Sequence, residues 1–282
     1  MALLCGVCGV RVPPHERNCP GCQGDVGFPN VRAAETTEEV AALNQRVRLA
    51  TEDAESRNCL SVLQEFASAV LSSKAVFCRS LSLLNSLVSS ETALYNTFHQ
   101  QVQAQARIPE ENFWDTARPA VGSTLFPHYY EKIGFALLSL DNQGSTRYGR
   151  YTIVLKDAMI ANRSSVFEEN PILFFQKRTD IKVGDTLVPG YRAIWAQRNK
   201  LAMAKCHTRV TQATPTADFP SILFKRGSTP AQDDFIEVHF YGPIHRSAIE
   251  KVIGPQPRRH ERAMFKDLQR KLREVGASLE TL

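Results

Sequence analysis

Four cysteines near the start of the chain constrain its local fold more than any other feature. Cys5 and Cys8 form one Cys-x-x-Cys pair, and Cys19 and Cys22 form a second pair after ten intervening residues. Glycine in or beside each pair allows the tight turns that aim four thiolates at one tetrahedral ion. Zinc is the usual ion for four sulfur ligands, and a site with no position open to water is structural. The spacing therefore predicts a structural zinc ribbon over residues 1–30.

Other uses of the seven cysteines are weaker interpretations. Two disulfides would leave three cysteines over and would need an oxidising compartment, while iron in a rubredoxin-like site is an alternative to zinc. Cys59 and Cys78 lie in apolar segments and are expected to be buried. Cys206 beside His207 allows a Cys–His nucleophile, although no third group is identifiable.

The composition describes an ordinary globular chain. Its 282 residues, 43% hydrophobic and 22% charged, can bury a sizeable core in one large domain or two small ones. The sequence holds no apolar run of the length that a membrane span needs, and its N-terminus lacks a basic segment. We therefore expect neither a membrane span nor a signal peptide, and we predict a cytoplasmic location.

One stretch near the C-terminus accounts for the net charge of +5. Residues 251–274 contain eight basic and three acidic side chains. Met264, Leu268, Leu272 and Val275 recur there at helical spacing, which favours an amphipathic helix with a solvated basic face. The same face can attract phosphate backbones, which makes nucleic acid the expected partner.

Apolar periodicity predicts an α+β chain in three parts: the zinc ribbon, a helical connector over residues 31–72 and a mixed α+β domain over residues 73–282. A capping box formed by Thr36 and Glu39 begins the first connector helix. Further helices are expected over residues 58–71, 81–88 and 92–106. Strands are expected over residues 74–79, 133–140, 151–155, 172–176, 191–196, 222–225 and 235–241.

The last predicted strand carries the most informative polar residues. Alternation places three apolar side chains on one face: Ile236, Val238 and Phe240. The other face carries three ionisable side chains: Glu237, His239 and Tyr241. The residue pattern by itself favours a solvated face, and a functional site is the alternative.

Two earlier segments have a similar ambiguity. The predicted strands over residues 133–140 and 151–155 flank a loop with Tyr148 and Gly149, so they form either a plain hairpin or a cleft with an aromatic wall. Gly149 would let a ligand approach the backbone there. Arg79 ends a predicted strand just before a helix, where it is either a surface arginine or a residue that binds a diphosphate.

Taken in order, these segments resemble the ADP-ribosyltransferase fold, in particular bacterial DarT-like toxins that ADP-ribosylate nucleic acid. Residues 78–87 resemble the first strand and helix of that family, residues 135–139 with 148–151 resemble its middle elements, and residues 235–238 resemble its late glutamate-bearing strand. The run from Tyr148 to Ile153 also resembles one in phage abortive-infection proteins. The resemblance spans about residues 73–255 and implies a split antiparallel sheet.

The resemblance also implies an enzyme that consumes NAD. Glu237 would stabilise the cationic ribosyl group as nicotinamide leaves, and His239 would orient the acceptor. The NAD-binding residues that it implies are Arg79, Ser139, Tyr148 and Tyr151. It further implies a toxin or phage-defence effector that acts on nucleic acid and that an antitoxin protein can accompany.

Two functions of other classes stay open. One is a non-enzymatic zinc-ribbon protein that binds nucleic acid or a partner protein. The other is a metal-dependent hydrolase that uses Glu237 and His239 with Glu168 and Glu169, although those two glutamates read more simply as part of a capped turn.

Overall fold

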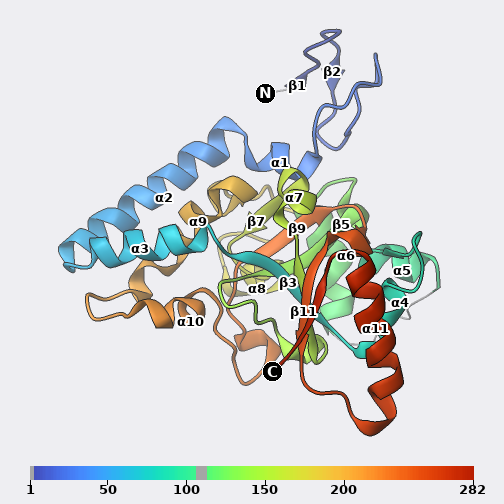
Figure 1. The fold of residues 1–282 in the computed structure, drawn as a ribbon. Helices are drawn as coiled ribbons and strands as arrows, with labels where there is room; N and C mark the ends of the chain where they lie inside the picture. Colours follow the sequence, from blue (N-terminus) through green and yellow to red (C-terminus); the bar gives the residue numbers. More distant parts are fainter. Residues whose placement is uncertain (1–2, 106–112) are drawn as a thin grey trace.

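A computed structural model describes residues 3–105 and 113–282, which fold around a mixed sheet of eight strands (Figure 1). In order across the sheet these are β12 (Ser278–Thr281), β11 (Ile249–Gly254), β6 (Tyr151–Leu155), β3 (Lys74–Arg79), β5 (Ile133–Ser139), β9 (Glu237–Tyr241), β7 (Ser164–Phe167) and β8 (Arg192–Ile194). Neighbouring strands are antiparallel except β11 and β12, which are parallel. The predicted α+β class is confirmed.

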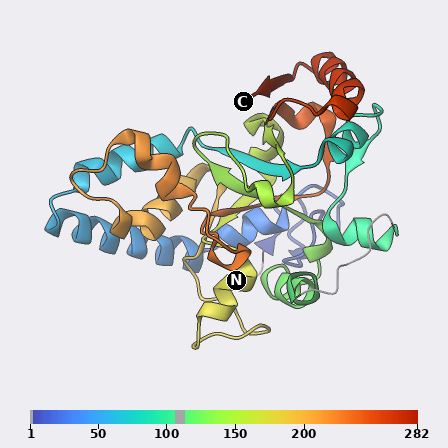
Figure 2. The ribbon, with the colours of Figure 1, turned by 90° about the horizontal axis from the view of Figure 1, so that it is seen from below.

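Two groups of helices lie at different ends of the molecule, as Figure 2 shows. One group lies at one end of the molecule and contains α2 (Thr37–Ser56), α3 (Leu60–Val70), α9 (Arg198–Cys206) and α10 (Phe219–Leu223). At the other end α11 (Arg262–Glu274) packs against α4 (Leu81–Leu87). The remaining helices are α1 (Pro29–Ala34), α5 (Phe98–Gln103), α6 (Phe113–Leu125), α7 (Asp157–Ile160) and α8 (Pro171–Lys177). Two short strand pairs complete the described part: β1 (Leu3–Leu4) with β2 (Arg11–Val12), and β4 (Leu94–Tyr95) with β10 (Ile244–His245).

The two faces of the sheet bury different apolar cores. Phe77, Leu138 and Ile153 belong to the larger core, together with side chains of α3 such as Leu63 and Phe66. Residues 31–72, predicted as a connector, therefore share a core with the sheet. The opposite face is covered partly by α6 and α8 and partly by a smaller cluster around Phe235.

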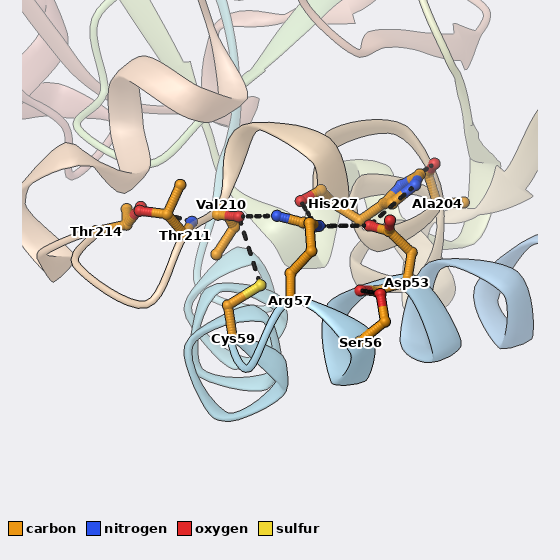
Figure 3. A network of polar contacts seen from close by, with 9 residues as sticks. All are labelled: Asp53, Ser56, Arg57, Cys59, Ala204, His207, Val210, Thr211 and Thr214. Atoms are coloured by element: carbon orange, nitrogen blue, oxygen red, sulfur yellow. Dashed lines mark hydrogen bonds and ion pairs between the residues drawn. The ribbon is translucent and has the colours of Figure 1, made fainter.

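A polar network fixes the turn between α2 and α3 to the chain that follows α9 (Figure 3). Arg57 donates hydrogen bonds to the carboxylate of Asp53 at 2.6 and 2.9 Å and to the carbonyl oxygens of His207 and Val210 at 2.8 and 2.6 Å. The thiol of Cys59 lies 3.5 Å from the same Val210 carbonyl. Arg57 thus joins the end of α2 to the chain after α9 through two backbone carbonyl groups.

Two predicted strands are helices. Residues 172–176 lie in α8, where Asn170 caps the N-terminus and Pro171 occupies the first turn. Residues 222 and 223 end α10, which also has proline in its first turn. The prediction was wrong for α8 because residues 171–175 are all buried. A continuous apolar run has no periodicity that distinguishes a helix from a strand.

Other elements differ in extent or were missed. The helix expected over residues 92–106 is confined to α5, after the short strand β4, and residue 106 lies outside the described residues. Glu168 and Glu169, predicted as part of a capped turn, lie between strand β7 and helix α8, whose N-terminus Asn170 caps. Strands β11 and β12 were missed, while the predicted amphipathic helix near the C-terminus is α11. No helix among the described residues is both long enough and apolar enough to cross a membrane.

Candidate active site

A cavity lies where strands β3 and β5 of the central sheet separate. Strand β3 pairs with β5 only through residues 74–76, after which residues 77–79 pair with β6 alone. Strand β5 meanwhile pairs with β9 through residues 133–137. A cavity of about 590 Å³ opens between the separated strands, a volume in the ordinary range for small-molecule sites. Its lining includes residues from both faces of the sheet, for example Val76 and Phe77.

Three of the residues singled out in the sequence line this cavity. Arg79 comes from the end of β3, Tyr148 from the turn before β6, and Glu237 from the start of β9. The separation of β3 and β5 therefore brings together side chains that are far apart in the sequence.

The other three residues do not line it. Ser139 is buried at the far end of β5, where its hydroxyl donates a hydrogen bond to Asp141 at 2.9 Å. Tyr151 is buried beside the ring of Phe265 from α11. His239 lies behind Glu237, away from the cavity wall.

Glu237 is a buried carboxylate with two specific partners. His239 Nε2 lies 2.8 Å from Oε1, and Asn170 Nδ2 donates to Oε2 at 3.2 Å. His239 is only 1% exposed and is surrounded by the rings of Phe126, Phe135 and Phe167. The expectation of a solvated face is therefore wrong, because α6 and α8 cover this face of β9.

Arg79 is held by neutral and aromatic groups. Its Nε donates to the hydroxyl of Tyr95, and Nη1 donates to the carbonyl of Cys78 at 2.6 Å. The guanidinium also lies 5.2 and 5.0 Å from the ring centres of Phe77 and Tyr95. These contacts orient the cation without neutralising it.

Gly149 has a different role from the one expected. Its φ is +145°, and a Cβ at this position would lie 2.0 Å from the carbonyl carbon of Arg79. The glycine therefore allows the turn to pack against the backbone at the end of β3, and this close contact leaves no space there for a ligand. The turn is fixed further by Arg147, which pairs with the buried carboxylate of Asp233 at 3.2 Å.

Tyr148 is the exposed aromatic residue of the cavity, with 58% of its surface accessible. Desolvation of its hydroxyl and the negative charge of Glu237 raise the pKa of Tyr148 above its ordinary value. The phenol is therefore neutral at physiological pH and can stack on or border a planar ligand.

Several lining residues were not found from the sequence: Tyr95, Phe98, Arg118, Asn170 and Phe235. Asn170 had a usable signal, since Asn followed by Pro is a favoured start of a helix. Arg118 had none, because nothing in α6 separates it from an ordinary helical arginine.

The four N-terminal cysteines form a separate cluster. Their sulfur atoms all lie within 4.8 Å of one another, with Cys5 and Cys22 at 3.6 Å and Cys8 and Cys19 at 3.4 Å. A tetrahedral zinc–thiolate site has sulfur atoms about 3.8 Å apart, so the four side chains fit a metal ion. Within residues 3–105 and 113–282, no other group of three or more His, Cys, Asp or Glu side chains is placed to hold one.

The remaining sequence candidates have structural partners. Cys206 is fully buried, which raises the pKa of its thiol to about 11 and leaves it without thiolate character. Glu168 pairs with Arg46 at 2.5 Å, and Glu169 pairs with Lys177. None of these side chains lines the cavity.

Helix α1 connects the cysteine cluster to strand β9. Asn30 is 1% exposed, and its side-chain amide lies 3.0 Å from the carbonyl of His239, 3.1 Å from that of Arg163 and 3.3 Å from the hydroxyl of Ser165. The ring of Phe28 contacts Tyr241 on the same strand. The segment that follows the cysteines is therefore anchored to strand β9, which carries Glu237.

Comparison of the sequence with models of known protein families and with curated proteins finds no match. The geometry of the cavity is therefore the basis for a functional proposal.

Proposed function

We propose that the protein is an NAD-dependent ADP-ribosyltransferase that modifies nucleic acid, as a bacterial toxin or phage-defence effector. The observation that supports this proposal is the convergence of Arg79, Tyr148 and Glu237 on one cavity at the split in the sheet. A cation can bind the diphosphate of a dinucleotide, an exposed aromatic ring can stack on nicotinamide, and a buried carboxylate can stabilise the cationic ribosyl group that forms as neutral nicotinamide leaves.

Glu237 has the geometry to stabilise a developing positive charge. Cleavage of the nicotinamide–ribose bond passes through a state in which the ribosyl carbon is strongly cationic. Hydrogen bonds from His239 and Asn170 fix the carboxylate before the reaction begins, so little reorganisation is needed as the charge develops. The same carboxylate would accept the proton of an attacking hydroxyl or amine.

Arg79 and Tyr148 would bind the two ends of the reacting half of NAD. The guanidinium of Arg79 would hold the diphosphate, since arginine donates forked hydrogen bonds to phosphate oxygens. Tyr148 would border the nicotinamide ring. His239 acts in this proposal through Glu237 and touches neither NAD nor the acceptor.

A structural zinc ion in the cysteine cluster completes the proposal. The module has few buried apolar residues, namely Cys5, Val12 and Cys19 with Val26 packed against them, so a metal would supply most of its stability. Helix α11 would attract the nucleic acid. On this helix Arg270 and Lys271 are paired with carboxylates, whereas the described residues include no acidic partner within 4 Å of Arg262, Lys266 or Arg273.

Labelled NAD tests the proposal directly. The parent protein should release nicotinamide and transfer label to DNA or RNA, while Glu237→Gln should lower the rate by about a hundred-fold or more. Glu52→Gln removes a surface carboxylate on α2 and should leave the rate unchanged. If the parent releases no nicotinamide, or if Glu237→Gln behaves like the parent, the proposal is wrong.

The cations of α11 that have no acidic partner within the described ranges also favour a second candidate, a nucleic-acid-binding protein without enzymatic activity. Such a protein would bind DNA or RNA with strong salt dependence and would turn over no nucleotide.

A further inference from the structure

Among the described residues, three arginines line the cavity, and their partners differ. Arg147 is neutralised by Asp233 and also donates to the carbonyl of Gly227. Within the described part of the chain, the hydrogen-bond partners of Arg79 are neutral groups of Tyr95 and Cys78. Arg118, from α6, lies 3.8 Å from Asp115, which is beyond hydrogen-bond distance. Two of the three cations are therefore incompletely neutralised in a cavity to which Glu237 contributes one negative charge.

The Nε atom of Arg118 is unsatisfied. It is buried and has no hydrogen-bond acceptor among the described residues. The guanidinium is held over the rings of Phe98 and Phe135, at 4.8 and 5.7 Å from their centres. The aromatic rings position the guanidinium but offer no lone pair to the buried N–H. A ligand atom that accepts this hydrogen bond would remove the cost of leaving the N–H without a partner.

Arg118 lies at the end of the cavity that holds Glu237. Both residues, together with Asn170, also line a small adjoining hollow between α6 and α8, which Arg79 does not reach. An incompletely neutralised cation near a ribosyl carbon that becomes cationic would raise the activation barrier for nicotinamide release. A phosphate bound to Arg118 would cancel that repulsion.

We infer that Arg118 is a second phosphate-binding residue of this cavity, which acts with Arg79 on the diphosphate of the substrate. The inference rests on the proposed function for the identity of the ligand. Arginine is suited to this role because its planar fork matches phosphate oxygens while its face stacks on aromatic rings.

One short stretch positions both arginines. Tyr95 of β4 binds Arg79, and Phe98 of α5 lies beneath Arg118. The two guanidinium groups are thus oriented before a ligand arrives, and the cavity would select a diphosphate over an uncharged nucleoside.

Calorimetric titration with ADP and with adenosine measures this selection without any chemical step. Arg118→Gln should weaken ADP binding by about ten- to a hundred-fold and leave adenosine binding unchanged. Arg118→Lys keeps a cation without the fork and should give an intermediate loss, which keeps the test usable if the glutamine variant folds poorly. Arg48→Gln on α2 removes a surface arginine and is the matched control.

A second assay distinguishes the source of the phosphate. If Arg118→Gln binds ADP normally and hydrolyses NAD normally but transfers label poorly to DNA, then Arg118 binds a phosphate of the acceptor. If ADP binding, hydrolysis and transfer are all unchanged, the inference is overturned. A parent protein that binds ADP through Arg118 but releases no nicotinamide from NAD would overturn the proposed function and leave the phosphate-binding role in place.

Discussion

The cysteine cluster and the cavity are built in opposite ways. The four sulfur atoms of the cluster come from residues 5–22, so the spacing of the cysteines is enough to predict that their thiols lie close together. The cavity draws Arg79, Arg118, Tyr148 and Glu237 from separate elements, and their meeting depends on where β3 and β5 part. A site built from neighbouring residues can therefore be predicted from their spacing in the sequence. A site built from several strands of a sheet can be predicted only when the order of the strands is known.

The largest effect should come from the cysteine cluster. Cys19→Ser removes a buried ligand, and we expect zinc content to fall from one ion per chain to nearly none. Elemental analysis of the purified protein measures this, with Cys59→Ser as a control because that cysteine lies outside the cluster. Equal zinc in the parent and in Cys19→Ser would show that the cluster is not the metal site.

A second effect tests the support behind Glu237. His239→Phe fits the surrounding aromatic rings but removes the hydrogen bond to the carboxylate, and kcat for nicotinamide release should fall about ten- to a hundred-fold. The KM for NAD should change by less than about three-fold, because His239 does not line the cavity. A change in KM with kcat unchanged would assign His239 to substrate binding instead.

A third effect tests the connection between the two regions. Asn30→Ala leaves the buried carbonyl of His239 and the partly buried carbonyl of Arg163 without this donor, and the free energy of unfolding should fall by about 1–3 kcal/mol. Urea titration measures the loss. Asn44→Ala, at an exposed position of α2, should change stability by less than about 0.5 kcal/mol. A similar value for both variants would mean that α1 does not brace strand β9.

The smallest effect concerns Tyr148. Its pKa is higher in the folded protein than in the unfolded chain, so the unfolded state loses this proton first as pH rises. Stability from this group is complete below the ordinary tyrosine pKa of about 10 and is lost as pH rises further. Tyr148→Phe should therefore reduce the alkaline loss of stability above about pH 10, which thermal melts between pH 8 and 11 measure. Identical alkaline profiles would contradict the raised pKa.

Much of the fold followed from local signals, and the errors have clear causes. The strand that contains Glu237 was predicted because Val238 and Phe240 alternate with polar residues, and the strand that contains Arg79 was predicted from a short apolar run with valine and phenylalanine. Residues 172–176 were predicted as a strand because the consecutive buried residues of α8 show no helical periodicity in the sequence. Ser139 and Tyr151 were included in the site by resemblance, but they face other parts of the molecule.

The sequence by itself determined the four-cysteine cluster, the α+β class, the basic C-terminal helix and the alternation that sets Glu237 opposite Val238. Only the tertiary structure decided that β3 and β5 separate after residue 76, that α6 and α8 bury the face of Glu237, and that Arg118 joins Arg79 in one cavity. The reason is physical: ligand spacing and side-chain alternation are properties of neighbouring residues, whereas the pairing of distant strands is set by how the whole chain buries its apolar surface.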